Sequence, residues 1–422
     1  GEDTFLSQMI KLVQQVQGSK VPIQAFADRI TLYFIPIVLS LAVIASISWF
    51  FGYQSMQPFM MKLSSFFPWI NYDMGALSTA VFVFVSTMVI ACPCALGLAT
   101  PMALLAGTSS AARKGLIIRN GEAIQSSKNI NVLLLDKTGT VTQGKPKVVQ
   151  IDMDPEDLNK IANIEKNSIH PLAKAIWEYN LPNYSEISIE DVREEVGHGI
   201  SGRHLSDTYF IGKPEYPSKY TELLNQGYTV LQALKNGQNI GCIAISDPIK
   251  EDSAHAVGEL KSMGIKVVMV TGDDEKTAAI ISKKVGIDEF EAGVKPEGKA
   301  DIVKKYQIQG YKVGMVGDGI NDAAALKSAD IGIAVGTGTD LAIESADIVI
   351  VKGELSKVAD AINISKITFL KIKQNLFWAF FYNVVAIPLA MTGVLHPIIS
   401  ELAMTFSSIN VILNSLSIRK KI

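Results

Sequence analysis

Four short segments in the middle of this 422-residue chain carry side chains suited to phosphate chemistry. Asp136 comes directly after the apolar run VLLL, so a carboxylate stands at the end of an expected strand, where it can attack a phosphoryl group. The other three segments offer a hydroxyl, an ammonium group and a carboxylate pair: Thr271 in VTGD, Lys295 and Lys299 in KPEGK, and Asp318 and Asp322 in GDGIND.

Together these side chains are chemically sufficient for phosphoryl transfer. Mg²⁺ prefers oxygen ligands and bridges phosphate oxygens, and the reaction depends mainly on positioning and on neutralising charge. A single Asp after a strand is usually a helix cap or a turn residue. Four such segments in order at strand ends favour one catalytic site with Asp136 as the nucleophile.

A second constellation, Cys92-Pro93-Cys94, lies within an apolar stretch. Residues two apart on an ideal helix point in nearly opposite directions, but Pro93 removes a backbone hydrogen bond and disrupts the helix. The two sulfurs can then converge while main-chain carbonyls line a cavity. Thiolates select Cu(I) or Zn²⁺. Two cysteines in a membrane helix are often packing residues, but the proline between them favours a metal site.

The phosphate segments must be positioned by alternating strands and helices. These are expected at Asn131–Leu135, Lys266–Val270, Glu275–Lys284, Lys312–Val316 and Asp322–Ser328. Such alternation predicts an α/β region with a parallel, doubly wound sheet, in which ligands bind beyond the C-terminal strand ends. The pattern changes between Gly144 and Ile245, which predicts an inserted domain.

The apolar residues gather near the two ends of the chain. A helix needs about 20 apolar residues to cross a bilayer. Four stretches qualify: Ile30–Phe51, Leu77–Ala99, Leu376–Leu395 and Pro397–Ser417. Basic residues follow the second stretch, precede the third and end the chain, so the middle segment and both termini are expected in the cytoplasm. The amphipathic run Thr4–Gln17 predicts a further cytoplasmic helix.

Composition narrows the class of protein. The charges nearly cancel, with 39 Lys and Arg against 41 Asp and Glu, which is not typical of a nucleic-acid-binding protein. The apolar share of 48% and the mean hydropathy of +0.25 exclude a disordered chain and favour a membrane component. Three cysteines cannot form a disulfide framework, so metal or redox chemistry is expected.

The segments DKTGT, TGD and GDGIND, with membrane spans around them, resemble the P-type ATPases, which use a haloacid-dehalogenase-like phosphorylation domain. The resemblance implies that Asp136 becomes an aspartyl phosphate, that Thr271 and Lys299 hold phosphate oxygens, and that Asp322 supports the Mg²⁺ site. The implied Mg²⁺ ligands are Asp136, the main-chain carbonyl of Thr138, and Asp318; Thr138, Asp273 and Asn321 are expected at the nucleotide phosphates. Soluble phosphatases of this fold carry an acidic residue where this chain has Thr138, which predicts slow hydrolysis of the phosphoenzyme.

The inserted segment resembles the nucleotide-binding domain of the same family. Ser168-Ile169-His170-Pro171 is similar to the Ser-Glu-His-Pro motif of heavy-metal pumps, and Gly197-His198-Gly199 to their glycine pair. The resemblance implies that His170, followed by Pro171, stacks on the adenine of ATP, while Gly197 and Gly199 allow close backbone approach. Ile169 replaces the expected acidic residue and Lys213 the usual Asn, so weakened nucleotide affinity is expected.

The membrane spans resemble the copper(I) branch of these pumps. Besides Cys92 and Cys94, the implied copper ligands are Tyr382, Asn383, Met404 and Ser408, with Ser407 as an alternative to Ser408. Zinc and cadmium pumps generally carry a Lys and an Asp in these spans, and none is found here. Glu401, three residues before Met404, is a further hypothesis for ion exit.

The predicted function is ATP-driven copper(I) export across the cell membrane. The expected parts are a cytoplasmic lead-in (1–29), two membrane helices (30–106), the phosphorylation domain (107–143 and 246–365), the nucleotide-binding domain (144–245) and two further membrane helices (366–422). The chain starts at Gly1 without a signal peptide, and the family's actuator domain and first membrane helices are not found. We therefore expect a catalytic half that does not transport alone, with copper delivered by a chaperone. The alternatives are a Zn²⁺ or Cd²⁺ pump and a non-transporting nucleotide or metal binder.

Overall fold

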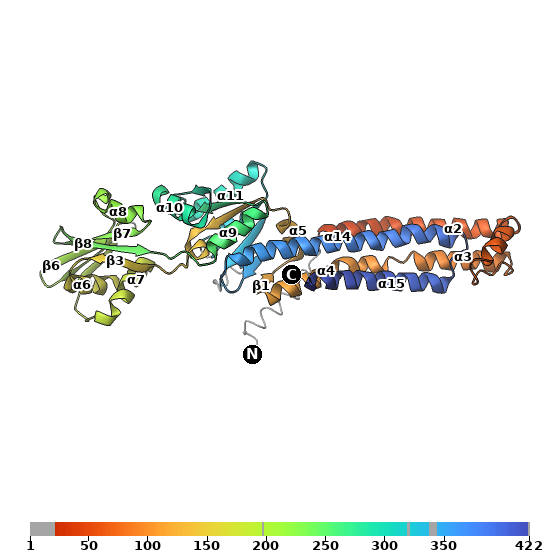
Figure 1. Cartoon of the computed structure of the whole chain (residues 1–422), viewed down its shortest axis with the longest axis horizontal. Helices are drawn as coiled ribbons and strands as arrows, with labels where there is room; N and C mark the ends of the chain where they lie inside the picture. The colour runs from red at the N-terminus through yellow and green to blue at the C-terminus, as the bar shows by residue number, and fades with distance from the viewer. Residues whose placement is uncertain (1–21, 196–197, 319–320, 337–343, 421–422) are drawn as a thin grey trace. The chain divides into compact units, whose positions relative to one another are not determined.

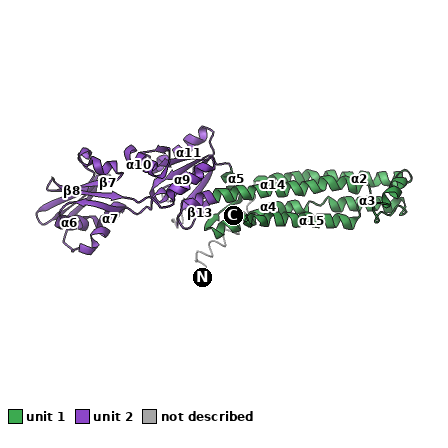
Figure 2. Cartoon of the chain, viewed as in Figure 1, with its two compact units in different colours: residues 1–128, 361–422 green, residues 129–360 purple. Residues whose placement is uncertain are grey.

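The computed structural model describes residues 22–195, 198–318, 321–336 and 344–420 (Figure 1). They fall into two compact units, one within residues 1–128 and 361–422 and the other within residues 129–360 (Figure 2). The predicted helix Thr4–Gln17 and the predicted site residue Gly197 lie outside the described residues.

The first unit is a helical bundle, and four helical segments of the described chain are long and apolar enough to cross a membrane. Its helices are α2 (Pro22–Ser64), α3 (Ala76–Ile90), α4 (Cys94–Arg113), α14 (Ser356–Met391) and α15 (Pro397–Leu416), followed by a 3₁₀ turn at Ser417–Lys420. A short strand, β1 (Leu116–Ile118), and helix α5 (Gly121–Ser127) follow α4. The four predicted membrane spans are confirmed.

Helix α2 is longer than the apolar stretch that predicted it. It begins at Pro22 rather than Ile30 and ends at Ser64 rather than Phe51, so residues 22–29 belong to this helix and not to a separate lead-in. Its 43 residues span about 65 Å, against a hydrocarbon core of about 30 Å. A helix can continue into water because its backbone hydrogen bonds are internal, and the uncharged window marks only the part suited to lipid.

Close helix contacts hold the bundle together. Trp49 of α2 packs in a buried cluster with Ala80 and Val83 of α3, and its indole N–H donates to the carbonyl of Met391 at 2.8 Å. A Cβ on Gly107 of α4 would collide with the side chain of Thr368 on α14. Small residues at such crossings let helix backbones approach closely inside a membrane.

The second unit contains a parallel sheet in the strand order β13-β12-β11-β2-β9-β10. The strands are β2 (Val132–Asp136), β9 (Lys266–Val270), β10 (Glu289–Glu291), β11 (Val313–Gly317), β12 (Ile331–Val335) and β13 (Ile348–Ile350). The helices between them are α9 (Ser253–Ser262), α10 (Glu275–Val285), α11 (Lys299–Ile308) and α12 (Ala323–Ser328). Strands β2, β11, β12 and β13 are buried throughout, as expected for a sheet covered on both faces. The predicted doubly wound fold is confirmed.

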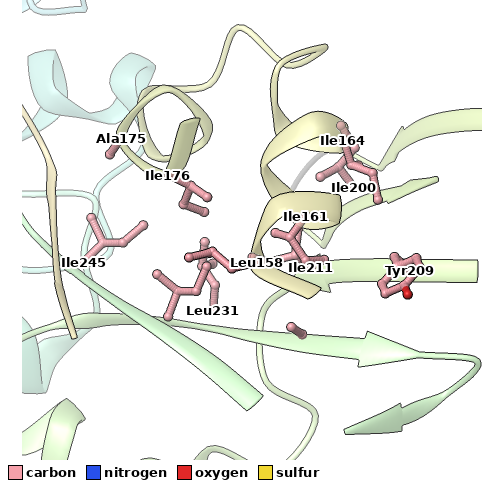
Figure 3. Packing of buried hydrophobic residues seen from close by; sticks show 12 residues of the cluster. Leu158, Ile161, Ile164, Ala175, Ile176, Ile200, Tyr209, Ile211, Leu231 and Ile245 are labelled. Atoms are coloured by element: carbon pink, nitrogen blue, oxygen red, sulfur yellow. The ribbon is translucent and has the colours of Figure 1, made fainter. Parts of the chain in front are cut away.

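An antiparallel sheet is inserted between β2 and α9, in the order β3-β8-β7-β6-β5-β4. Its strands are β3 (Lys147–Asp152), β4 (Glu190–Glu195), β5 (Gly199–His204), β6 (Asp207–Gly212), β7 (Thr229–Lys235) and β8 (Gln238–Ser246). Helices α6 (Pro155–Glu165) and α7 (Pro171–Asn180) pack on it through a buried cluster that includes Leu158, Ile161 and Ile176 (Figure 3), and α8 (Thr221–Asn225) precedes β7. The apolar positions of α6 recur at helical spacing, which directs them into this core.

Candidate functional site

The sheet of the second unit places the predicted catalytic segments side by side. Asp136 is the last residue of β2, a central strand, and in register it pairs with Val270 of β9. Leu135 pairs with Val316 of β11 on the other side. Thr271, which follows Val270, and the GDGIND segment at the end of β11 therefore flank Asp136 at the C-terminal edge of the sheet.

Lys299 connects the two acidic segments. Its ammonium group donates to Oδ1 of Asp136 and to Oδ1 of Asp322, each at 2.6 Å. All three side chains are buried, with exposed fractions of 8%, 7% and 0% respectively. Lys295, the other candidate cation, is exposed. The structure thus brings Lys299 to the site, because Lys299 opens α11 whereas Lys295 precedes the turn before that helix.

The site carries more negative charge than Lys299 can neutralise. Burial, and then the neighbouring Asp322, raise the pKa of Asp136 to about 7, although Lys299 opposes this shift. Burial acts to lower the pKa of Lys299, but the two carboxylates outweigh it and raise that pKa above its ordinary value. A further cation would therefore be stabilised beside Asp136.

Two glycines let the acidic loops approach each other. Gly139 has a φ of +72°, and a Cβ there would lie 3.3 Å from the side chain of Asp318, so the loop after β2 touches the loop after β11. A Cβ on Gly317 would collide with Asp322. Only glycine fits such close approaches without displacing a carboxylate.

These loops fit the predicted Mg²⁺ ligand set of Asp136, Asp318 and the Thr138 carbonyl, which are the oxygen ligands that this ion prefers. Asp322 Oδ2 is buried and has no hydrogen-bond partner among the described residues, so acceptor capacity is left over. No group of three or more His, Cys, Asp or Glu side chains arranged for a metal occurs in the described ranges. The predicted set does not require one, because its third ligand is a main-chain carbonyl.

The remaining predicted phosphate contacts lie around this centre. Thr271 is buried, and its hydroxyl accepts the backbone N–H of Asp273 at 3.1 Å. The carboxylate of Asp273 accepts from the ammonium group of Lys137 at 2.7 Å. Thr138, two residues after β2, and Asn321, four residues after β11, are both exposed, as a group that meets an incoming substrate must be.

Lys250 is a residue that the sequence did not single out. Its ammonium group donates to the main-chain carbonyls of Gly139 at 2.6 Å and Gly353 at 2.7 Å. These two bonds link the loop that follows Asp136 to the segment around Gly353. Burial lowers its pKa, while Asp252, Asp247 and Asp318 partly offset this. A single Lys in SDPIK carries no sequence signal for such a role.

The inserted domain contains a cavity of about 340 Å³ whose lining includes His170, Gly199 and Lys213. The His170 ring is exposed, and its Nδ1 accepts the backbone N–H of Leu172 at the start of α7. Pro171 lines a neighbouring cavity of about 640 Å³ together with Thr138 and Asp273, which leads back toward the acidic loops. The predicted nucleotide contacts are thus divided between the two cavities: Gly199 lines the first, Pro171, Thr138 and Asp273 line the second, and His170 lines both. Asn321 lines neither cavity, and Ile169 is fully exposed at the rim of the first.

Glu165, in the wall of the same cavity, was also missed by the sequence reasoning. It is the last residue of α6 and is 5% exposed. Burial, followed by the nearby Glu194, raises its pKa to about 7. Glu165 stands four residues after the core residue Ile161, so helical spacing places this carboxyl group on an apolar face. That placement is the signal that could have identified it.

The helix that carries the paired cysteines is interrupted next to Pro93, as predicted from the sequence. α3 ends at Ile90 and α4 begins at Cys94, and the two sulfurs converge and are joined as a disulfide in the structure. Reduction of this pair would give two thiolates, the form in which cysteine binds soft metal ions. A small cavity of about 10 Å³ is lined by Cys92 and by four of the other predicted or alternative ligands, Tyr382, Asn383, Met404 and Ser407.

Of the two candidate serines, the structure places Ser407 and not Ser408 in the wall of this cavity. The hydroxyl of Ser408 donates instead to the carbonyl of Met404 at 3.2 Å. One residue turns a helix by about 100°, so the choice between neighbours depends on the rotation of α15 in the bundle. Glu401 is exposed and does not line the cavity.

Residues 130–330 match the family model of haloacid dehalogenase-like hydrolases. The whole chain is 43% identical to the "Probable copper-importing P-type ATPase A" of Enterococcus hirae, covering 57% of it, and 41% identical to the "Copper-exporting P-type ATPase" of Staphylococcus saprophyticus, covering 52%. The chain therefore spans about half the length of these curated relatives.

Nearly the whole chain is similar to a solved structure. The crystal structure of a zinc-transporting PIB-type ATPase in the E2.Pi state matches 99% of this chain and 68% of that protein. The TM-score is 0.74 and the sequence identity 30%.

Proposed function

Because the chain belongs to the PIB-type, heavy-metal branch of the P-type ATPases, we propose that it couples ATP hydrolysis to copper(I) export through an aspartyl phosphate at Asp136. The observation that carries the proposal is the buried bridge from Lys299 to Asp136 and Asp322 at the C-terminal edge of a parallel sheet. This arrangement combines a nucleophile, a fixed cation and spare carboxylate oxygens in one place.

In the proposed reaction, a carboxylate oxygen of Asp136 attacks the γ-phosphorus of ATP, a new P–O bond forms, the bond to the bridging oxygen breaks, and ADP leaves with that electron pair. Lys299, released from Asp136 as the ester forms, neutralises charge on the transferred phosphoryl oxygens, and the Thr271 hydroxyl donates to them. Mg²⁺ held by Asp136, Asp318 and the Thr138 carbonyl would supply further charge neutralisation. Asp322 keeps Lys299 oriented throughout.

The cavity of the inserted domain is the proposed adenine site. His170 offers an exposed ring for stacking, and Gly199 offers backbone without a side chain. Glu165 presents a buried carboxyl group to hydrogen-bond the base. Lys213, where Asn is usual in the family, adds a cation at the junction of the two cavities.

Copper(I) is the proposed cargo, bound by Cys92 and Cys94 with Met404, Tyr382, Asn383 and a serine of α15. Soft sulfur ligands select a soft monovalent ion. Support comes from the cavity, which is lined by all of these residues except Cys94, from the contact between the sulfurs of Cys94 and Cys92, and from the names of the curated relatives. Cytoplasmic catalytic domains and termini, and delivery of the ion by a copper chaperone, are parts of the same proposal.

Labelling with γ-labelled ATP tests the proposal in the complete protein. We expect an acid-stable, hydroxylamine-sensitive label that requires copper(I) and disappears in Asp136→Asn. A protein that binds ATP without acquiring such a label would be a binder and not a pump. The same assay with Zn²⁺ tests the alternative raised by the likeness to a zinc-transporting structure, and stimulation by zinc but not copper would favour that alternative.

The direction of transport needs a separate measurement, because the two curated relatives are named for opposite directions. We expect inside-out vesicles that contain the complete protein to accumulate copper when ATP is added outside. Loss of copper from preloaded vesicles under the same conditions would indicate import.

A further inference from the structure

Four hydroxyl groups on α3 and α15 are buried and have no hydrogen-bond partner among the described residues: Thr79, Ser86, Ser400 and Ser407. Their residues have exposed fractions of 1%, 0%, 0% and 4%. Ten buried side-chain polar atoms lack a partner in the described part of the chain, and these two helices contribute four of them. A buried polar group without a partner is costly, so this concentration requires an explanation.

Other hydroxyls on the same two helices are satisfied within their own helix. Thr87 donates to the carbonyl of Val83 at 2.8 Å, and Thr405 to the carbonyl of Glu401 at 3.0 Å. This bond to the preceding turn is the usual solution for Ser and Thr in an apolar helix. Because the four hydroxyls lack it, they are left to bind something that the helices enclose.

By helical spacing, the four hydroxyls lie on the same helix faces as residues of the cavity at Cys92. Thr79 and Ser86 are two turns apart, and Ile90 follows one turn later, so these residues share a face of α3. Ser400 and Ser407 share a face of α15 with Met404 in the same way. Ile90, Met404 and Ser407 line the cavity at Cys92, and α3 packs against α15. Thr79, Ser86 and Ser400 therefore lie on the same helix faces as residues that line that cavity, farther along each helix.

The row of hydroxyls runs toward one end of the bundle. At 1.5 Å per residue, Ser86 lies about 9 Å and Thr79 about 20 Å from the level of Cys92, toward the start of α3. Ser400 lies about 6 Å from Met404, toward the start of α15. Both helices start at the short connections that the proposed topology places outside.

We propose that Thr79, Ser86, Ser400 and Ser407 hold water and form the exit path of the metal ion. Hydroxyl oxygen and water bind copper(I) more weakly than thiolate or thioether sulfur does, and an ion leaves only along a path that binds it weakly. The ion exchanges its sulfur ligands for water beside Ser407 and moves outward past Ser400, Ser86 and Thr79. This inference rests on the proposed function as a metal-exporting pump.

The test uses the complete protein in vesicles with the combined changes Thr79→Val, Ser86→Ala and Ser400→Ala. Each change removes a hydroxyl with little change in volume, and Ser407 is left intact because it also borders the ligand cavity. We expect copper-stimulated phosphorylation from ATP to stay within twofold of the unchanged protein. Copper delivery into the vesicle lumen is expected to fall at least fivefold.

Matched controls are Thr87→Val and Thr405→Val, whose hydroxyls bond to their own helices, and transport by both is expected to be unchanged. Unchanged delivery in the triple variant, or equal slowing in the controls, would overturn the exit path alone. Absence of copper-stimulated phosphorylation in the unchanged protein would overturn the proposed function as well.

Thermal unfolding in detergent separates this role from a structural one. If the hydroxyls have no protein partner, the triple variant unfolds at the same temperature as the unchanged protein or higher. A fall of more than about 5 °C, which for a chain of this size reflects at least a kcal/mol, would show that they bond to protein and would refute the inference. Ser86→Ala alone is a milder variant, for which copper delivery and the unfolding temperature are measured in the same way.

Discussion

The ammonium nitrogen of Lys299 lies 2.6 Å from Oδ1 of Asp136, although 163 positions separate the two residues in the chain. The same nitrogen lies 2.6 Å from Oδ1 of Asp322. One buried cation thus binds two buried carboxylates, so the site keeps an excess of negative charge. A metal ion would neutralise that excess, and an incoming phosphate group would interact with Lys299.

Loss of Lys299 is expected to affect both catalysis and stability. In Lys299→Met the two carboxylates remain buried without their cation, and breaking such a buried pair costs about 3–5 kcal/mol. We expect phosphorylation of Asp136 to fall at least ~100-fold, as when a preorganised charge-stabilising donor is removed. Labelling and chemical unfolding measure the two effects. Lys295→Met, in the same segment but exposed, serves as the control, and similar losses in both variants would contradict the assignment.

Phosphorylation is expected to depend on pH through Asp136. Its pKa is raised to about 7, so at limiting Mg²⁺ the nucleophile is increasingly protonated below pH 7 and the labelling rate falls by about fivefold from pH 7 to pH 6. Saturating Mg²⁺ favours the carboxylate and shifts the profile to lower pH. Rapid-quench labelling across this range measures the effect, and a flat profile at limiting Mg²⁺ would be inconsistent with it.

The same raised pKa predicts how stability varies with pH. A carboxyl group whose pKa is higher in the folded state contributes stability below its unfolded value of about 4 and loses that contribution as the pH rises through about 7. Asp136→Asn removes this dependence. We therefore expect the free energy of unfolding of Asp136→Asn, minus that of the unchanged protein, to increase between pH 5 and pH 8. Chemical denaturation in the presence of a metal chelator measures this difference.

Glu165 is expected to contribute to nucleotide binding. Glu165→Ala removes the buried carboxyl group from the cavity wall, and we expect ATP affinity to fall about tenfold, the equivalent of one hydrogen bond to a buried group. Glu165→Gln keeps a hydrogen-bonding side chain of the same size and is expected to lose less. Calorimetric titration compares them with Glu178→Ala, an exposed position on α7. Equal affinities for all three variants would exclude a role for Glu165.

Lys250 is expected to position the phosphorylation loop without binding ATP. Lys250→Met releases the carbonyls of Gly139 and Gly353, and we expect the phosphorylation rate to fall about tenfold while the KM for ATP changes less than twofold. Glu251→Gln is the neighbouring control. A change confined to KM would show that Lys250 meets the nucleotide instead.

The paired cysteines are expected to confer the requirement for metal. Cys92→Ser and Cys94→Ser each replace a soft ligand with a hard one. The stimulation of phosphorylation by copper(I) is therefore expected to fall more than tenfold in each variant. Phosphorylation by inorganic phosphate, which does not require bound cargo, is expected to persist. Cys242→Ala, which alters a buried cysteine of the inserted domain, is expected to leave copper stimulation intact.

Local signals in the sequence were sufficient for the main features of the fold. The long apolar stretches, of which only the fourth carries a charge (Glu401), identified all four membrane helices, and the apolar strands ending in Gly and Asp identified the parallel sheet. These features depend on periodicity and on residue type, both of which can be read along the chain. They did not give the ends of α2, because a helix that leaves the lipid continues on its own hydrogen bonds.

By contrast, the physical basis for choosing between neighbouring candidates came from tertiary structure. The resemblance pointed to Lys299 and to Ser408, but in each pair both residues have the same chemistry. The structure buries Lys299 rather than Lys295, and it places Ser407 rather than Ser408 in the cavity wall. Their burial is set by the start of α11 and by the rotation of α15. Glu165 and Lys250 likewise acquire their surroundings from segments far along the chain. Residue types and their spacing along the chain establish which chemistry is present. Packing establishes which atoms meet, because burial and contact depend on the whole chain.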